Sequence, residues 1–265
     1  MTSAPAEIRA REAGFWHDLG AIAGRAVRAI PREKESVIPA LLIPMFWLLV
    51  SVGALETIAG FVYPGLDFRG FQLPVAVVFA VTGVSRAPDL VIDIQNGYFD
   101  RLTITPVSRP SLLLGMMVAD LALVIALTLP VLGIGWVLGV RFASGLAGVF
   151  AFLALAGLWG VAFTAVLYAI ALKTANPAAI TAGLLLFFPF AFLTTTFLPQ
   201  EALSGWMATA AEYNPMTYLL AALRSLILEG WEWETLLAGF GAVIGLGLVS
   251  VSLAFLALRS RLQPR

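Results

Sequence analysis

Six long apolar runs constrain this chain more than any other feature of its sequence. They cover residues 37–60, 71–92, 111–139, 146–172, 178–198 and 236–258. A helix needs about 20 apolar residues to cross the hydrocarbon core of a bilayer, and a helix satisfies its own backbone polar groups inside lipid. The composition agrees, since 60% of the residues are hydrophobic and 12% are charged, against about half and about a quarter in soluble domains. We therefore predict an all-α integral membrane protein with six transmembrane helices.

A polar segment, residues 1–36, precedes the first apolar run. Within it, apolar side chains recur at steps of three and four and fall on one helical face. Charged side chains fall on another face; the two sets are Phe15, Leu19, Ile22, Ala26 and Ile30 against Asp18, Arg25, Arg28 and Arg32. This pattern predicts an amphipathic helix in the cytoplasmic membrane interface, with a helix that packs on a soluble partner as the alternative. The chain thus divides into a cytoplasmic N-terminal segment, 1–36, and a transmembrane domain, 37–265.

Basic residues indicate how the spans are oriented. If both termini and the loops after the second and fourth spans lie on one side, that side holds 13 of the 16 basic residues. The other side holds three, which are Arg69, Arg141 and Arg224. Because Lys and Arg are enriched in cytoplasmic loops, we predict that both termini are cytoplasmic. Charged residues also mark where the second span is expected to meet water on that side: Arg86, Asp89 and Asp93.

Residues 199–235 are apolar but interrupted. Asn214-Pro215 divides them into two parts, and five Glu residues punctuate them. Each part, at about 14 residues, would be about 21 Å long as a helix, which is shorter than a hydrocarbon core of about 30 Å. We therefore predict a re-entrant helical hairpin on the outer face before the last span, sheltered by protein or lining a water-filled cavity.

A short polar island, residues 94–110, separates the second and third runs. It carries prolines at positions 106 and 110, and basic side chains at Arg101 and Arg109. Its apolar side chains Leu102, Ile104 and Val107 favour a compact knob on the cytoplasmic side. Such a loop can engage acidic groups on a partner protein. Alternatively, lipid headgroups and the ends of its own helices hold it.

Several classes of function lack the residues that they need. The chain has no G-x-x-x-x-G-K-[ST] motif, so it cannot cradle ATP by a P-loop. It has one His, His17, and no Cys, so we expect no catalytic dyad inside the membrane and no metal site. Its 16 basic and 16 acidic residues balance, which argues against a nucleic-acid partner.

Two motifs resemble the signatures of ABC-2 type exporter permeases. The first, Gly97-Tyr-Phe-Asp-Arg-Leu-Thr-Ile-Thr-Pro-Val-Ser-Arg109, is similar to a G-x-x-D-R-L-x-x-[ST]-P-[VL]-S-R run that follows the second span in that family. The second motif comprises Phe197-Leu-Pro199 with Glu201, then Tyr213-Asn-Pro-Met-Thr-Tyr218 and Ala222-Leu-Arg224. It is similar to a signature that precedes the last span. Together the motifs and spans most resemble membrane subunits of daunorubicin-resistance-type drug exporters.

The resemblance implies a permease subunit that works with a separate ATPase and with a second permease copy or a paralogue. ATP and Mg²⁺ would bind the ATPase, so no cofactor is expected in this chain. The coupling residues implied by the first motif are Gly97, Asp100, Arg101, Leu102, Pro106, Ser108 and Arg109. The hairpin signature comprises Pro199, Glu201, Asn214, Pro215 and Arg224. The expected location is the bacterial plasma membrane, in contact with its lipids, and the expected cargo is an amphipathic or hydrophobic drug or lipid-like molecule.

Two further features are candidates for a transport path. Asp120 lies about ten residues into the third span, where an ionisable side chain usually faces the bundle interior. It is expected to pair with Arg86, to line the path, or to serve as a satisfied packing residue. The aromatic run Phe187, Phe188 and Phe190 with Thr195 would suit a pocket for flat hydrophobic molecules, while lipid-facing or core positions are the alternative.

Other functions stay open at the level of the sequence. Within the exporter class, a polysaccharide or a polar lipid is the main rival cargo. An ion-coupled secondary transporter would need several deep carboxylates, whereas here Asp120 is deep and Glu56 lies near an outer end. A membrane scaffold protein that transports nothing is the remaining alternative.

Overall fold

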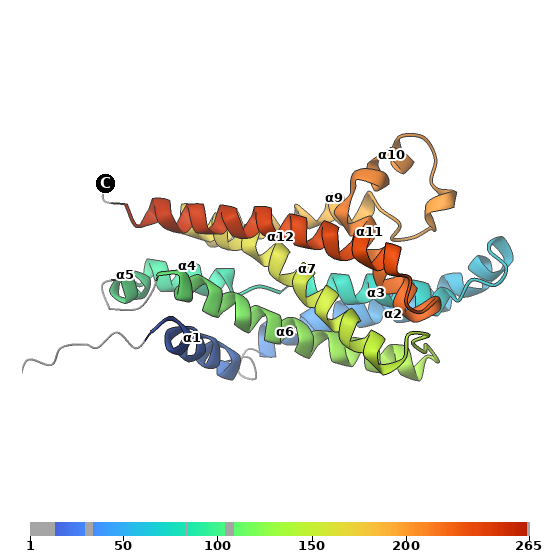
Figure 1. Cartoon of the computed structure of the whole chain (residues 1–265), viewed down its shortest axis with the longest axis horizontal. Coiled ribbons are helices and arrows are strands. Elements are labelled where there is room, and N and C mark those ends of the chain that lie inside the picture. Colours follow the sequence, from blue (N-terminus) through green and yellow to red (C-terminus); the bar gives the residue numbers. More distant parts are fainter. Residues whose placement is uncertain (1–13, 30–33, 83, 104–108, 264–265) are drawn as a thin grey trace, which may run out of the picture.

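The computed structural model describes residues 14–29, 34–82, 84–103 and 109–263, and every regular element within these ranges is a helix. The helices of the main bundle lie lengthwise along the molecule (Figure 1): α2 (Lys34–Val62), α3 (Phe68–Thr82), α6 (Arg109–Val137), α7 (Gly145–Thr174) and α12 (Trp233–Arg261). Five segments are long and apolar enough to cross a membrane: Val37–Val62, Phe68–Gln95, Pro110–Val137, Gly145–Thr174 and Trp233–Arg261. The chain is therefore a multi-pass helical membrane protein.

Helix α7 forms the centre of the bundle and packs against α12, α6 and α3. It carries three of the largest fully buried side chains, Trp159, Tyr168 and Phe152. Small residues let its backbone approach α6, since a Cβ added at Gly160 would lie 2.6 Å from Val124 Cγ2. Close approach at small residues is the usual way in which membrane helices pack.

The second predicted span is present, but it consists of two helices rather than one. Helix α3 ends at Thr82, and α4 (Ala87–Gln95) begins with Pro88 in its first turn. Proline lacks a backbone N–H and disfavours a helical residue before it, so the chain starts a new helix here. Arg86, which we expected to meet water, is buried in this break, with 6% of its surface exposed.

The fifth apolar run is also interrupted. Helix α8 (Pro177–Leu184) is followed by the short α9 (Phe187–Phe192), and no residue from 193 to 199 is helical. Pro189 cannot donate to the carbonyl four residues earlier, which coincides with the break at residues 185–186. The apolar helical stretch Pro177–Phe192 is shorter than the five long spans, so a sixth continuous span is not confirmed.

The segment before the last span divides at Asn214, where the sequence predicts a break. Helix α10 (Gly205–Tyr213) follows a 3₁₀ turn, η2 (Gln200–Ala202), and stands out from the bundle (Figure 1). Helix α11 (Pro215–Leu228) instead packs on α12 and α3. The two helices therefore meet at the expected residue, Asn214.

Two short helices and the N-terminal helix gather at one end of the bundle. Helix α5 (Tyr98–Thr103) follows α4, and α1 (Phe15–Ala29) packs on α6. The end of α12 lies at the same end of the molecule (Figure 1). This end contains the part of the predicted coupling loop that the structure describes.

Candidate functional site

The described part of the predicted coupling loop contains the short helix α5, which is joined to α4 by a tight turn. Gly97 makes this turn with a φ of +69°, a left-handed conformation that favours glycine. After it, Phe99 is buried and Leu102 packs on the core, while Asp100 and Arg101 are exposed. Helix α5 is thus anchored by one face and presents charged groups on another.

The remaining coupling residues lie at the edge of the described chain. Pro106 and Ser108 fall outside the described residues, as does the side chain of Arg109. The backbone of Arg109 begins helix α6. The structure therefore places four of the seven predicted coupling residues, Gly97, Asp100, Arg101 and Leu102, in one turn and helix, whose surface carries Asp100 and Arg101.

Helix α1 packs directly against this surface. Arg25 Nη1 donates a hydrogen bond to the Tyr98 hydroxyl at 3.1 Å, and its guanidinium carbon lies 5.2 Å from the centroid of the Tyr98 ring. Ile22 packs so closely on α6 that a Cβ at Gly115 would come within 2.7 Å of Ile22 Cγ2. We name α1, α4 and α5 together the coupling layer.

The coupling layer also touches the ends of the central helices. Gln95 Nε2 donates to the carbonyl of Ala175, just after α7, at 2.9 Å. A groove of 680 Å³ beside α5 is lined by Asp100, Lys173 and Arg261 among others. Helix α5 therefore faces the ends of both α7 and α12 across this groove, and a displacement of α5 would change its spacing from both.

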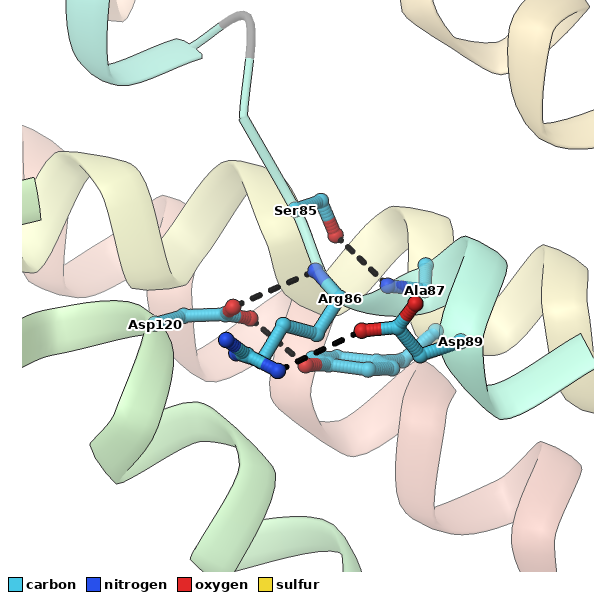
Figure 2. A network of polar contacts seen from close by, with 6 residues as sticks. Ser85, Arg86, Ala87, Asp89 and Asp120 are labelled. Carbon is cyan, nitrogen blue, oxygen red and sulfur yellow. Dashed lines mark hydrogen bonds and ion pairs between the residues drawn. The ribbon is translucent and has the colours of Figure 1, made fainter. Parts of the chain in front are cut away.

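A buried polar network secures the start of α4 (Figure 2). Asp120 on α6 is 1% exposed and accepts two hydrogen bonds, one from the backbone N–H of Arg86 at 3.2 Å and one from the Tyr168 hydroxyl at 2.6 Å. The Arg86 side chain forms an ion pair with Asp89, at 3.3 Å. Because the first N–H groups of a helix lack partners and favour a carboxylate, Asp120 acts as a cap supplied by another helix. We name Arg86, Asp120 and Tyr168 the α4 joint.

A second contact supports the same break from the α3 side. Trp159 Nε1 on α7 donates to Thr82 Oγ1 at 2.9 Å, while that hydroxyl donates to the carbonyl of Val78. Both halves of the broken span are therefore attached to α7. One of the three roles expected for Asp120 is a contact with Arg86. The hydrogen bond from the backbone N–H of Arg86 makes such a contact.

The aromatic run does not form one surface. Phe187 is buried and packs edge-on against Phe79 and Phe163, with ring centroids 5.1 and 5.9 Å away. Phe190 is half-buried against Trp159, whereas Phe188 is 48% exposed. The run is therefore divided between the core and the outside of the bundle.

The hairpin residues Asn214 and Arg224 hold the non-helical segment that follows α9. Asn214 Nδ2 donates to the carbonyls of Phe190 and Leu193 at 2.8 and 2.7 Å. Arg224 uses all three of its nitrogens, bonding the carbonyl of Phe71 at 3.0 Å and both the hydroxyl and the carbonyl of Thr195 at 2.9 and 2.8 Å. Thr195 thus serves as a partner of Arg224. Backbone carbonyls freed by the break are paired inside the protein, as membrane depth would require.

The other hairpin residues lie around this bonded core. Pro215 stands in the first turn of α11. Pro199 is half-buried before η2, and Glu201 is exposed within it. The structure brings Asn214, Pro215, Arg224 and Thr195 together and leaves Glu201 at the periphery.

Sequence reasoning missed several residues that contact these sites. Tyr168 was not singled out, although a Tyr inside an otherwise apolar span is a signal for a buried polar partner. Tyr98 and Gly115 occur in or beside the first motif, but their contacts with α1 could not be foreseen. Within the described ranges, no three His, Asp or Glu side chains gather as metal ligands would.

The family assignment follows from comparison of the whole chain. Residues 18–228 match the family model for ABC-2 type transporters, which covers most of α1, all of α4 and α5, the α4 joint and the hairpin residues. The chain belongs to the ABC-2 type transporter family. This ABC-2 permease is 28% identical over 200 residues, 75% of its own length and 72% of the relative's, to the probable doxorubicin resistance ABC transporter permease protein DrrC of Mycobacterium tuberculosis.

A second relative covers more of the ABC-2 permease. The daunorubicin resistance ABC transporter permease protein DrrB1 of Streptomyces coeruleorubidus is 28% identical over 233 residues, or 86% of this chain and 80% of that protein. The chain is thus homologous to permease subunits of drug-resistance ABC transporters.

Proposed function

We propose that this ABC-2 permease forms the membrane path of an ATP-driven exporter whose ATPase is a separate subunit. The supporting observation is the coupling layer, where the anchored helix α5 presents Asp100 and Arg101 beside α1 and the end of α12. ATP and Mg²⁺ bind the ATPase, and its movement enters the permease through residues 94–110. A second permease copy or a paralogue completes the path.

The α4 joint passes this movement to the membrane helices. Helices α4 and α5 are joined by one tight turn at Gly97, so they move together. The start of α4 is bonded to Asp120 on α6, which is itself bonded to Tyr168 on α7. A displacement of α5 therefore pulls on α6 and α7 through hydrogen bonds and not only through apolar packing.

The broken segments close the other end of the path. Helices α8 and α9, with residues 193–199, form the sixth crossing, and α10 with α11 forms a re-entrant hairpin above it. The paired carbonyls around Asn214 and Arg224 support this proposal, because irregular backbone at membrane depth needs such shelter.

The proposed cargo is an amphipathic or hydrophobic molecule. Two relatives carry doxorubicin or daunorubicin resistance in their names, and both compounds are drugs. The proposed location is the bacterial plasma membrane with both termini in the cytoplasm.

Single cysteine labels test the orientation, because the chain has no Cys of its own. Thr105→Cys should react with an impermeant thiol reagent only after cells are opened, while Asp67→Cys should react in intact cells. Labelling of position 105 from outside intact cells would reverse the proposed orientation.

Removal of two basic residues tests the ATPase interaction. Arg101→Ala with Arg109→Ala should leave the stability of the permease within about 0.5 kcal/mol of wild type, as for most surface changes. Truncating a paired interface charge costs about 2–5 kcal/mol of binding, so the ATPase retained on co-purification should fall at least about tenfold. Export should fall with it.

The matched control removes an exposed basic residue at the same end of the molecule but outside the coupling layer, Arg259→Ala on α12. This variant should retain the ATPase and export normally. If Arg101→Ala with Arg109→Ala exports at the wild-type rate with ATPase bound, the coupling assignment is wrong. If that variant is degraded, the loop mainly holds the ends of the neighbouring spans.

A further inference from the structure

A groove of 460 Å³ lies between α6 and α7, at the end of the bundle opposite the coupling layer (Figure 1). Its floor is Leu73 of α3, which is 1% exposed, and its rims include Leu129 and Leu146, which are 51% and 74% exposed. Two glycines keep it open, because a Cβ added at Gly133 or at Gly145 would meet nothing within 4 Å. The volume falls in the range of ligand sites, about 300–1,000 Å³.

One fixed positive charge stands at the mouth of this groove. Arg141 Nη1 donates to the carbonyls of Trp136 and Val140 at 2.8 and 2.9 Å, and its guanidinium carbon lies 5.0 Å from the centroid of the Trp136 ring. A guanidinium has five N–H donors. Within the described part of the chain, the two hydrogen bonds of Arg141 use Nη1, so the N–H groups on Nε and Nη2 can bind a ligand. This planar fork matches a phosphate.

The surroundings place the mouth at the depth of lipid headgroups. Trp136, Trp231 and Trp233 are exposed at this end, and exposed tryptophans mark the membrane–water interface. Trp231 also donates to the carbonyl of Ser144, on the same turn as Arg141, at 3.2 Å. Gly133 and Leu129 lie about 6 and 12 Å deeper in the bundle than Val137, the last residue of α6, at about 1.5 Å per residue.

We propose that this groove binds one anionic phospholipid of the leaflet at this end of the bundle. Its phosphate pairs with Arg141, and an acyl chain lies beside Gly133 over Leu73. Phosphate is the anion that a bilayer supplies at this depth, and the apolar rims match an acyl chain that is already in the membrane. The proposal does not depend on the ATPase or on the cargo.

Lipid titration of the purified full-length permease, followed by native mass spectrometry, tests this site. The probes are phosphatidylglycerol, diacylglycerol with the same chains, and inorganic phosphate. Gly133→Leu fills the groove where the Cβ has room, and Arg141→Gln removes the charge. Each should weaken phosphatidylglycerol binding at one site about tenfold, or about 1.4 kcal/mol. Arg141→Gln should also abolish the preference for phosphatidylglycerol over diacylglycerol.

The control is Gly53→Leu, on the exposed face of α2, where an added Cβ also meets nothing within 4 Å. It should bind phosphatidylglycerol as wild type does, and thermal unfolding in detergent should show all three variants folded. Unchanged binding in Gly133→Leu would overturn the proposal. Tight binding of inorganic phosphate alone would show an ion site instead, and a change of oligomeric state in Gly133→Leu would show that a second copy covers the groove.

Discussion

The contribution of the hydrogen bond between Asp120 and Tyr168 to stability can be measured by mutation. Both residues are buried, with 1% and 0% of their surfaces exposed. Asp120→Leu leaves two buried donors without an acceptor, the Tyr168 hydroxyl and the Arg86 backbone N–H. Each such donor costs about 1–3 kcal/mol, so the free energy of unfolding should fall by about 2–6 kcal/mol. Asp120→Asn keeps an acceptor oxygen and should cost less.

Combining Asp120→Leu with Tyr168→Phe isolates the bond itself. The second change removes the hydroxyl that the first leaves unpaired, so the two losses should not add. Hydrogen bonds between membrane helices show coupling energies of about 0.6 kcal/mol on average and up to about 1.7 kcal/mol, and this short buried bond should lie in the upper part of that range. Unfolding by SDS in mixed micelles, followed by tryptophan fluorescence, measures each variant.

Thr128→Val with Tyr168→Phe is the control pair. Thr128 is also buried on α6 and bonds the carbonyl of Val124, but it lies about 12 Å along the helix from Asp120. Its effect should add to that of Tyr168→Phe within about 0.5 kcal/mol. A coupling energy near zero for Asp120 and Tyr168 would refute the α4 joint as a stabilising contact. If the coupling energy has the expected size and Tyr168→Phe still exports normally, the hydrogen bond has a structural role only.

Three further changes probe the turn, the hairpin and the coupling layer. Gly97→Ala should cost about 1–2 kcal/mol of unfolding free energy, because a residue with a Cβ resists the left-handed turn; Gly97→Asn, which tolerates that conformation, should cost less in the same SDS titration. Arg224→Met should cost about 1–3 kcal/mol by leaving the Thr195 carbonyl without a donor, and Arg224→Lys should rescue little because it lacks the planar fork; thermal unfolding in detergent measures both. Gly115→Ala should displace α1, and adding Ile22→Ala should restore its position, as read from disulfide cross-linking between introduced cysteines on α1 and α6.

Apolar length located the long helices well because hydropathy alone decides which segments enter a bilayer. The run predicted at 146–172 is α7, Gly145–Thr174, and the run at 236–258 lies within α12, Trp233–Arg261. The break at Asn214-Pro215 was also predicted. The Asn side chain can cap a new helix, and Pro has no backbone N–H to continue the preceding one. These features depend on local chemistry that can be seen in one stretch of sequence.

The breaks inside the second and fifth runs depend on contacts between distant residues. In the sequence, Arg86 and Asp89 indicate the end of a span, because nothing in the neighbouring sequence shows that Asp120 and Tyr168 lie beside Arg86 in the fold. The end of α9 is stabilised by Asn214, which is 22 positions after Phe192. A single sequence orders such residues along the chain but does not show which of them meet.

Charged residues in the bundle of this permease serve its own backbone, which bears on the cargo. Both carboxylate oxygens of Asp120 accept bonds at the α4 break. Two nitrogens of Arg224 donate to Thr195 in the break after α9, and the third donates to the carbonyl of Phe71 in α3. A buried group whose bonds are already made gains little by binding a cargo molecule and loses those bonds if it turns toward one. If Asp120 or Arg224 turned to bind a cargo molecule, the backbone groups at the helix breaks would lose their hydrogen-bond partners. Selection of cargo by apolar shape, as expected for an amphipathic or hydrophobic molecule, is therefore favoured over selection by an ion pair with Asp120 or Arg224.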